Sequence, residues 1–198
     1  MRGPERGAGR RPRLYLTVDD GPDPDGTPRW LETLGRHRAR AVFFLSADRA
    51  QRWPGLVGQI LAAGHRVGSH GGPHVSAWRT RPARTLAAFD HAERVLDRLA
   101  GAPVRDVRPP YGRVTPGLAR WAARGGRRLV LWDVMPGDFV ASQTPERLAR
   151  EVVELARPGS IVALHDGPPA ARATAALDLA LPRLAAAGWR FAALPAAP

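Results

Sequence analysis

The chain has 198 residues, enough for one domain with a real core, and 44% of them are hydrophobic against 24% charged, which excludes a mostly disordered protein. It contains no cysteine, which excludes disulfides and thiolate metal sites, so any metal must be held by His, Asp or Glu. The net charge of +12 comes from 30 basic residues that are all arginine and are spread along the chain, so we interpret it as solvated surface and codon bias, with attraction to an anionic polymer such as a cell-wall glycan as the alternative.

The amino terminus carries no apolar signal segment. Residues 1–12 are rich in Gly, Arg and Pro and are predicted to form a disordered basic arm, which leaves one domain over residues 13–198. No apolar run approaches the ~20 residues that cross a bilayer, so we expect no membrane span. Localisation stays open between the cytoplasm and, if a leader was removed, the cell exterior or cell wall.

From residue 13 onward, short apolar runs alternate with amphipathic stretches of helical length. Strands are predicted at 14–18, 41–45, 65–69, 106–108, 128–131, 160–164 and 189–192. Helices are predicted at 28–38, 54–63, 81–100, 115–124, 144–156 and 170–187. This alternation is typical of parallel β/α units in a single α/β domain, built as either an open sheet or a barrel.

Polar side chains stand at the carboxyl ends of five predicted strands. They are Asp19-Asp20, His70, Arg108, Trp132-Asp133 and His165-Asp166. In β/α folds the loops at these ends converge over a rigid scaffold, which is where catalytic groups lie. The pattern therefore predicts one active site assembled from five segments.

Two of these segments predict a metal site. Asp19 and Asp20 are adjacent carboxylates, which are explained equally well by turn chemistry or by a cation beside them. His70 and His74 are four residues apart on a tight loop, a spacing that lets both ring nitrogens reach one ion. Two His and one Asp suit Zn²⁺ or a similar divalent ion. We interpret three other histidines as ordinary surface or core residues: His37, His65 and His91.

Two further segments add candidates that are weaker individually. The run Arg108-Pro109-Pro110-Tyr111-Gly112 is either a rigid turn or a loop that aims a guanidinium into the site and presents the Tyr111 backbone N–H. His165 follows a predicted buried strand, where a proton donor would be useful.

Together these segments resemble the NodB-homology polysaccharide deacetylases, carbohydrate esterase family four, from about residue 14 to 194. Thr17-Val18-Asp19-Asp20-Gly21-Pro22 is similar to the family motif T-F-D-D-G-P, and the His70/His74 pair to H-[ST]-x-x-H. The run at 108–112 matches R-x-P-[YF]-G, residues 132–139 resemble the fourth motif, and 164–166 resemble the closing L-x-H.

The resemblance implies a distorted, partly open (β/α) barrel of about seven parallel strands that removes acetyl groups from N-acetylhexosamine polymers or acetylated xylan. It implies one divalent ion, with zinc expected and cobalt, nickel or manganese as alternatives, held by Asp20, His70 and His74. The implied roles of the other residues are Asp19 as base, Arg108 as its partner, His165 as acid, Asp138 as the partner of His165, Tyr111 as oxyanion donor, and Leu164, Trp132 and Phe139 as pocket residues. Acetylated glycans are the expected partners, with no nucleic acid, and we expect a monomer.

Three positions depart from the family pattern. Gly71 replaces the Ser or Thr that usually steadies the second histidine, Val75 replaces a common Pro, and Phe139 lacks the indole N–H of the usual Trp. The first departure predicts weaker retention of the metal, because losing a group that orients a ligand typically lowers metal affinity by ~10–100-fold. Two alternatives stay open on the sequence: a non-catalytic glycan-binding relative and a basic nucleic-acid-binding protein. A third keeps the fold and the metal but hydrolyses another C–N or ester bond.

Overall fold

The strand β1 (Arg13–Asp19) is paired on both edges within a parallel sheet, in a computed structural model that describes residues 11–196. One edge of β1 pairs with β2 (Ala41–Leu45), and the other edge pairs with β6 (Ile161–His165). Side chains alternate along β1, so that Leu14, Leu16 and Val18 pack against helices while Thr17 and Asp19 face the other way.

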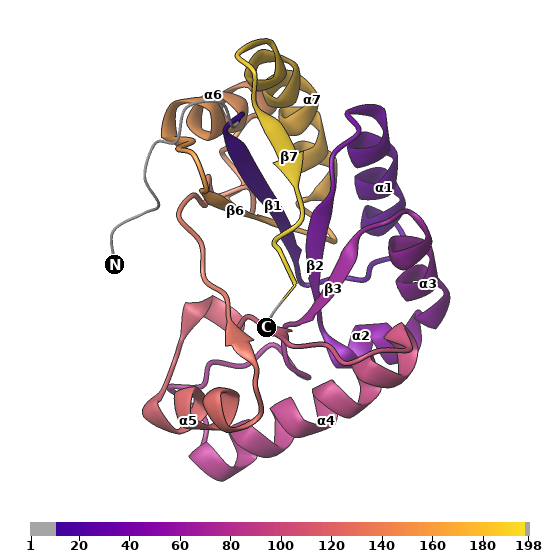
Figure 1. The fold of residues 1–198 in the computed structure, drawn as a ribbon, viewed down its shortest axis with the longest axis vertical. Coiled ribbons are helices and arrows are strands. Elements are labelled where there is room, and N and C mark those ends of the chain that lie inside the picture. The colour runs from indigo at the N-terminus through magenta and orange to yellow at the C-terminus, as the bar shows by residue number, and fades with distance from the viewer. Residues whose placement is uncertain (1–10, 197–198) are drawn as a thin grey trace.

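The remaining strands extend the sheet to an order of β5-β4-β3-β2-β1-β6. They are β3 (Arg66–Ser69), β4 (Asp106–Val107) and β5 (Arg128–Leu129). The last strand, β7 (Arg190–Ala192), pairs with Arg13–Tyr15, the beginning of β1 that β2 does not reach. Figure 1 shows β7 entering the sheet beside β1. Every pairing is parallel, as the alternation of elements predicts.

The sheet curls into a half-barrel, which confirms the predicted distorted and partly open (β/α) barrel in a single domain. Its two ends, β5 and β6, are joined only indirectly. The chain that leaves β5 runs to the free edge of β6, where Val134 makes an isolated parallel bridge to Val162. The segment after β5 therefore crosses the opening of the barrel.

Helices cover the outer face of the sheet (Figure 1). They are α1 (Gly26–Arg36), α2 (Ala47–Arg52), α3 (Pro54–Ala62), α4 (Pro82–Ala100), α5 (Pro116–Arg124), α6 (Pro145–Leu155) and α7 (Ala170–Ala186). Four of them begin with proline, which costs no helical hydrogen bond there because the N–H groups of the first turn have no acceptor within the helix. The sequence did not predict α2 or the short 3₁₀ turn Pro110–Gly112. No helix in residues 11–196 is long and apolar enough to span a bilayer.

The two faces of the sheet carry different cores. The large core lies between the strands and the helices and includes Trp30, Leu34 and Phe43. The inside of the barrel holds only a small apolar cluster of Val42, Phe44, Val130 and Leu194. The inner face also carries polar groups: Thr17 and Asp19 meet the fully buried Arg108 there. Of the predicted basic arm over residues 1–12, residues 1–10 lie outside the described part.

Candidate metal centre and active site

The carboxyl ends of β1, β3 and β6 meet at a cavity of about 360 Å³. Strand register explains the meeting, because Asp19 is level with Phe44 on β2 and with His165 on β6. The loops after these strands supply most of the lining, which consists of Asp19, Asp20, His70, His74, Tyr111, Trp132, Met135, Phe139, His165 and Pro169. Eight of these ten residues were candidates from the sequence; Met135 and Pro169 were not, because neither carries a chemical signal.

Asp19 and Asp20 face the same cavity although they are neighbours in sequence. Successive side chains of a strand point to opposite faces, so two adjacent carboxylates would normally diverge. Asp20 breaks the alternation because its backbone is left-handed, with φ +71°. Aspartate is one of the few residues besides glycine that adopts this conformation at modest cost. The turn therefore brings the second carboxylate round to the histidines.

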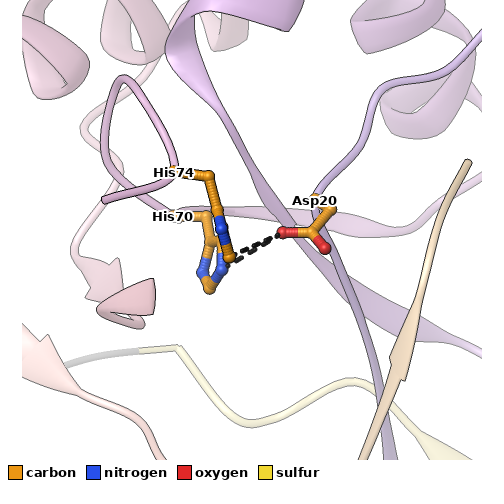
Figure 2. Close-up of side chains that lie close together, drawn as sticks. All are labelled: Asp20, His70 and His74. Carbon is orange, nitrogen blue, oxygen red and sulfur yellow. Dashed lines mark ion pairs between the residues drawn. The ribbon is translucent and has the colours of Figure 1, made fainter. Parts of the chain in front are cut away.

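Asp20, His70 and His74 form a cluster with the shape of a metal site. Oδ1 of Asp20 lies 3.4 Å from Nε2 of His70 and 3.3 Å from Nε2 of His74, and one ligand atom from each residue falls within 4.8 Å of the others. Figure 2 shows both rings directed at the same carboxylate oxygen. That oxygen is buried and has no hydrogen-bond partner among the described residues. Buried polar atoms are rarely left without a partner, so the donor set fits a divalent cation.

The two histidines are held differently. His70 is fully buried, and burial lowers its pKa to about 3, which keeps the ring in the neutral form that binds metals. The side chain of His74 is 39% exposed and rests against the edge of Tyr111, with ring centroids 4.6 Å apart. Gly71 has a φ of +83°, a conformation that strains a Ser or Thr at this position. At position 71 the chain therefore has no hydroxyl beside His74, whose ring packs on Tyr111 instead.

Asp19 is paired with Arg108 inside the barrel. Nη1 of Arg108 donates to Oδ1 of Asp19 at 2.7 Å and to Oγ1 of Thr17 at 2.7 Å. The guanidinium also donates to the carbonyls of Val130 and Leu131 and lies 4.2 Å from the ring centroid of Phe44. Burial raises the pKa of the Asp19 carboxyl above its ordinary value, and the charge of Arg108 opposes that rise. Thr17 is a contact that sequence reasoning did not single out.

Asp138 and His165 make the second charge pair of the cavity. Asp138 is fully buried, accepts from Nδ1 of His165 at 2.8 Å, and accepts from the His165 backbone N–H at 2.7 Å. Burial alone would lower the pKa of His165, but the hydrogen bond and charge of Asp138, with the charges of Asp19 and Asp20, raise it overall. Phe139 packs edge-on against the His165 ring, with centroids 5.1 Å apart.

One candidate from the sequence lies elsewhere. Leu164 does not line the cavity; it is 1% exposed and belongs to the large core between sheet and helices. The reason is strand alternation, because His165 faces the inside of the barrel and its neighbour must face the helices. The residue on the inner face before His165 is Ala163, which is level with Thr17 on β1. The expected role of Leu164 in binding the acetyl methyl group is therefore wrong.

The sequence matches one family model and many known proteins. Residues 6–130 match the model described as polysaccharide deacetylase. A peptidoglycan-N-acetylglucosamine deacetylase of Bacillus cereus is 32% identical over 92% of this chain, an alignment that spans 66% of that relative. A chitooligosaccharide deacetylase of Azorhizobium caulinodans is 33% identical, and the alignment covers 92% of both chains.

Solved structures share the fold. The peptidoglycan N-acetylglucosamine deacetylase Bc1960 superposes with a TM-score of 0.89 at 30% identity, covering 93% of this chain and 87% of that one. The pseudoenzyme BA3943 of Bacillus anthracis superposes with a TM-score of 0.85 at 23% identity, covering 93% of this chain and 64% of that one, which concerns the fold alone.

Proposed function

The chain belongs to the polysaccharide deacetylase family, and we propose that it is a metal-dependent hydrolase that removes acetyl groups from an N-acetylhexosamine polymer. One observation carries this proposal: the cluster of possible metal ligands lines the same cavity as the buried carboxylate of Asp19 and the ring of His165. The relatives support the substrate class through their names, which include peptidoglycan and chitooligosaccharides.

Asp20, His70 and His74 are proposed to hold one divalent ion, with zinc as the first candidate because of the N,N,O donor set. When bound, such an ion polarises a carbonyl and lowers the pKa of a coordinated water to ~7. The chain's own residues then provide the proton transfers and the orientation of the substrate.

Asp19 is proposed as the general base. Arg108 holds Oδ1 of Asp19, while Oδ2 accepts no hydrogen bond from the described residues and is free to take a proton from the attacking water. The buried pair fixes the carboxylate in one orientation, which a base that must reach one proton requires. Water adds to the acetyl carbonyl as Asp19 takes this proton. The backbone N–H of Tyr111 is proposed to face the developing negative oxygen.

His165 is proposed as the general acid. Asp138 holds Nδ1, which leaves Nε2 for the nitrogen of the sugar. As the C–N bond breaks, that nitrogen takes the proton of the imidazolium and leaves as a free amine, while the acyl group leaves as acetate. An amine leaves poorly unless it is protonated, so the raised pKa of His165 suits this role. Trp132 and Phe139 form part of the apolar wall around the reacting group.

The test is acetate release from chitin oligomers, peptidoglycan and acetylxylan, before and after chelation and after metal is restored. We expect release that is lost on chelation and recovered with zinc. Asp19→Asn and His165→Ala should each lower kcat by ~10²–10⁴-fold, the usual contribution of a positioned acid or base. Asp25→Asn and His91→Ala, two exposed positions outside the cavity, serve as controls. Wild-type turnover in either active-site variant would overturn the assigned roles, and glycan binding without acetate release would identify a non-catalytic relative.

A further inference from the structure

A second groove of about 550 Å³ adjoins the active-site cavity. His74 and Tyr111 line both hollows, so a chain of sugars that places one residue at the metal cluster can place the next one in this groove. Its full lining is His74, Val75, Ser76, Trp78, Arg79, Thr80, Tyr111 and Arg113. We call it the Trp78 groove. It has two arginines and no acidic residue.

The side chains of Trp78 and Arg113 stack on each other within this groove. The indole Nε1 of Trp78 donates to the carbonyl of Val114 at 3.1 Å, which fixes the ring although it is 61% exposed. The guanidinium carbon of Arg113 lies 4.1 Å from the centroid of the Trp78 ring. A guanidinium stacked on an aromatic face keeps its in-plane N–H donors available, in the fork that matches a carboxylate.

No described residue uses these donors. Arg79 and Arg113 are exposed, and their side chains make neither a hydrogen bond nor an ion pair within residues 11–196, so both guanidinium groups are open to a ligand in the groove. Another hollow that His74 also lines has a different balance of charge. It contains Asp20, Asp48 and Asp166, and its one arginine, Arg49, is paired with Asp23 at 3.1 Å. Arginines without an acidic neighbour therefore line the Trp78 groove, whereas acidic residues predominate in this second hollow.

We propose that the Trp78 groove binds a carboxylate carried by the sugar next to the N-acetylhexosamine that is deacetylated. Arg113, with Arg79, would hold the carboxylate, and Trp78 would act as a positioning residue for Arg113. The inference rests on the proposed function and deepens it: the substrate is an anionic N-acetylated glycan in which a carboxylate-bearing sugar adjoins the reacting one, in preference to a neutral chitin oligomer. A neutral oligomer offers no charged partner for the two guanidinium groups of the groove.

The test compares three tetrasaccharides. The first alternates N-acetylglucosamine with N-acetylmuramic acid, the second is the same molecule with its carboxylates converted to carboxamides, and the third is chitotetraose. We expect the lowest KM for the carboxylate form. Arg113→Gln and Arg79→Gln should each raise that KM by about 10-fold, a value between those for a buried and an exposed charged hydrogen bond, and should leave the carboxamide form and chitotetraose unchanged.

Two variants of Trp78 distinguish a residue that positions Arg113 from one that only supports the fold. Trp78→Leu should raise KM for the carboxylate form as Arg113→Gln does, with kcat little changed, and Trp78→Phe should restore most of the affinity because it keeps an aromatic face. The double variant Trp78→Leu/Arg113→Gln should be no worse than Arg113→Gln alone, because both changes remove the same interaction. Arg190→Gln is the control: Arg190 is exposed and lies at the opposite end of the sheet, where β7 meets the start of β1.

Binding is measured separately by calorimetry on the chelated His165→Ala variant, in which we expect turnover to be too slow to disturb the measurement. Equal KM and equal affinity for the carboxylate and carboxamide tetrasaccharides would overturn the inference, even with acetate release intact. Absence of acetate release from every glycan would instead overturn the proposed function, and the calorimetric comparison would still decide whether the groove selects a carboxylate. Loss of the preference in Arg113→Gln, but not in Arg190→Gln, supports it.

Discussion

Asp138 uses both of its carboxylate oxygens on His165, one on the ring and one on the backbone N–H. This arrangement fixes the rotation of the imidazole and favours its protonated form, since a buried negative charge adjoins Nδ1. The raised pKa of His165 means that the acid form persists to higher pH than for an unperturbed histidine. In the proposed mechanism, Asp138 therefore extends to higher pH the range in which His165 can give a proton to the leaving nitrogen.

The first prediction concerns Asp138→Asn. Because the amide carries no charge, the pKa of His165 should fall, and the alkaline limb of the profile of kcat/KM against pH should move to lower pH. The rate at the optimum should also fall, because the amide has one acceptor oxygen for the two His165 donors, the backbone N–H and the ring Nδ1–H. The pH at the midpoint of the alkaline limb is measured separately from the maximum value of kcat/KM. Asp97→Asn is the control, since Asp97 accepts the Val104 N–H far from the cavity. An unchanged alkaline limb would show that Asp138 does not tune His165.

At the scale of elements, His65 joins two neighbouring strands. It lies just before β3, and its Nδ1 accepts from the N–H of Ala41, the first residue of β2, at 3.3 Å. His65 is 4% exposed. Burial, with the nearby charge of Arg40, lowers its pKa to about 4. The unfolded chain therefore binds a proton at His65 more readily than the folded chain between that pKa and the ordinary value of about 6.5.

The sign follows from this difference in proton binding. As pH falls through about 6.5, the unfolded state gains a proton that the folded state refuses, so the free energy of unfolding decreases until the pKa of about 4 is reached. His65→Gln keeps an acceptor for Ala41 but does not titrate. Between pH 7 and 5 we expect wild type to lose on the order of 1–2 kcal/mol more than this variant, as measured by urea unfolding. The comparison with a variant is needed because Asp166, whose pKa burial raises to about 6, acts in the opposite direction. Equal losses in the two proteins would contradict the prediction.

Elements whose pattern is local could be predicted from the sequence. The helix α4 was predicted because its apolar residues recur at helical spacing and Gly101 ends it, and β2 because five apolar residues follow one another. The polar residues at strand ends also identified most of the cavity lining, because each one follows an apolar run that is visible in the local sequence. The helix α2 escaped prediction because its six residues are too short and too polar to show a period. Leu164 was misplaced although strand alternation alone puts it on the face opposite to His165.

Features that depend on distant packing could not be predicted. The contact of Thr17 with Arg108 and the burial of Asp138 arise from segments that meet only in the folded sheet. The Trp78 groove is the clearest case. Trp78 meets Val114 and Arg113, which are more than 30 residues further along the chain, and nothing in the local sequence of Trp78 indicates this contact.

At the scale of the whole molecule, the metal cluster connects segments that are not neighbours in the sheet. Asp20 follows β1, and His70 and His74 follow β3, while β2 lies between these strands. An ion held by all three would join two loops across an intervening strand. Because the ligands are together only in the folded chain, binding energy of the ion would add to the free energy of unfolding.

The last prediction follows from this linkage. At a free zinc concentration 100 times the Kd, the folded chain gains about 2.7 kcal/mol, which for a protein of this size raises Tm by about 5–10 °C above the chelated sample. His74→Ala should show a much smaller rise, because one ligand is lost, whereas His91→Ala should keep the full rise, because His91 is exposed on α4 and outside the cluster. Thermal unfolding of the three proteins, chelated and then with zinc, measures the effect without any substrate. An equal rise in wild type and His74→Ala would mean that zinc stabilises the fold from some other place, and the ligand assignment would then be wrong.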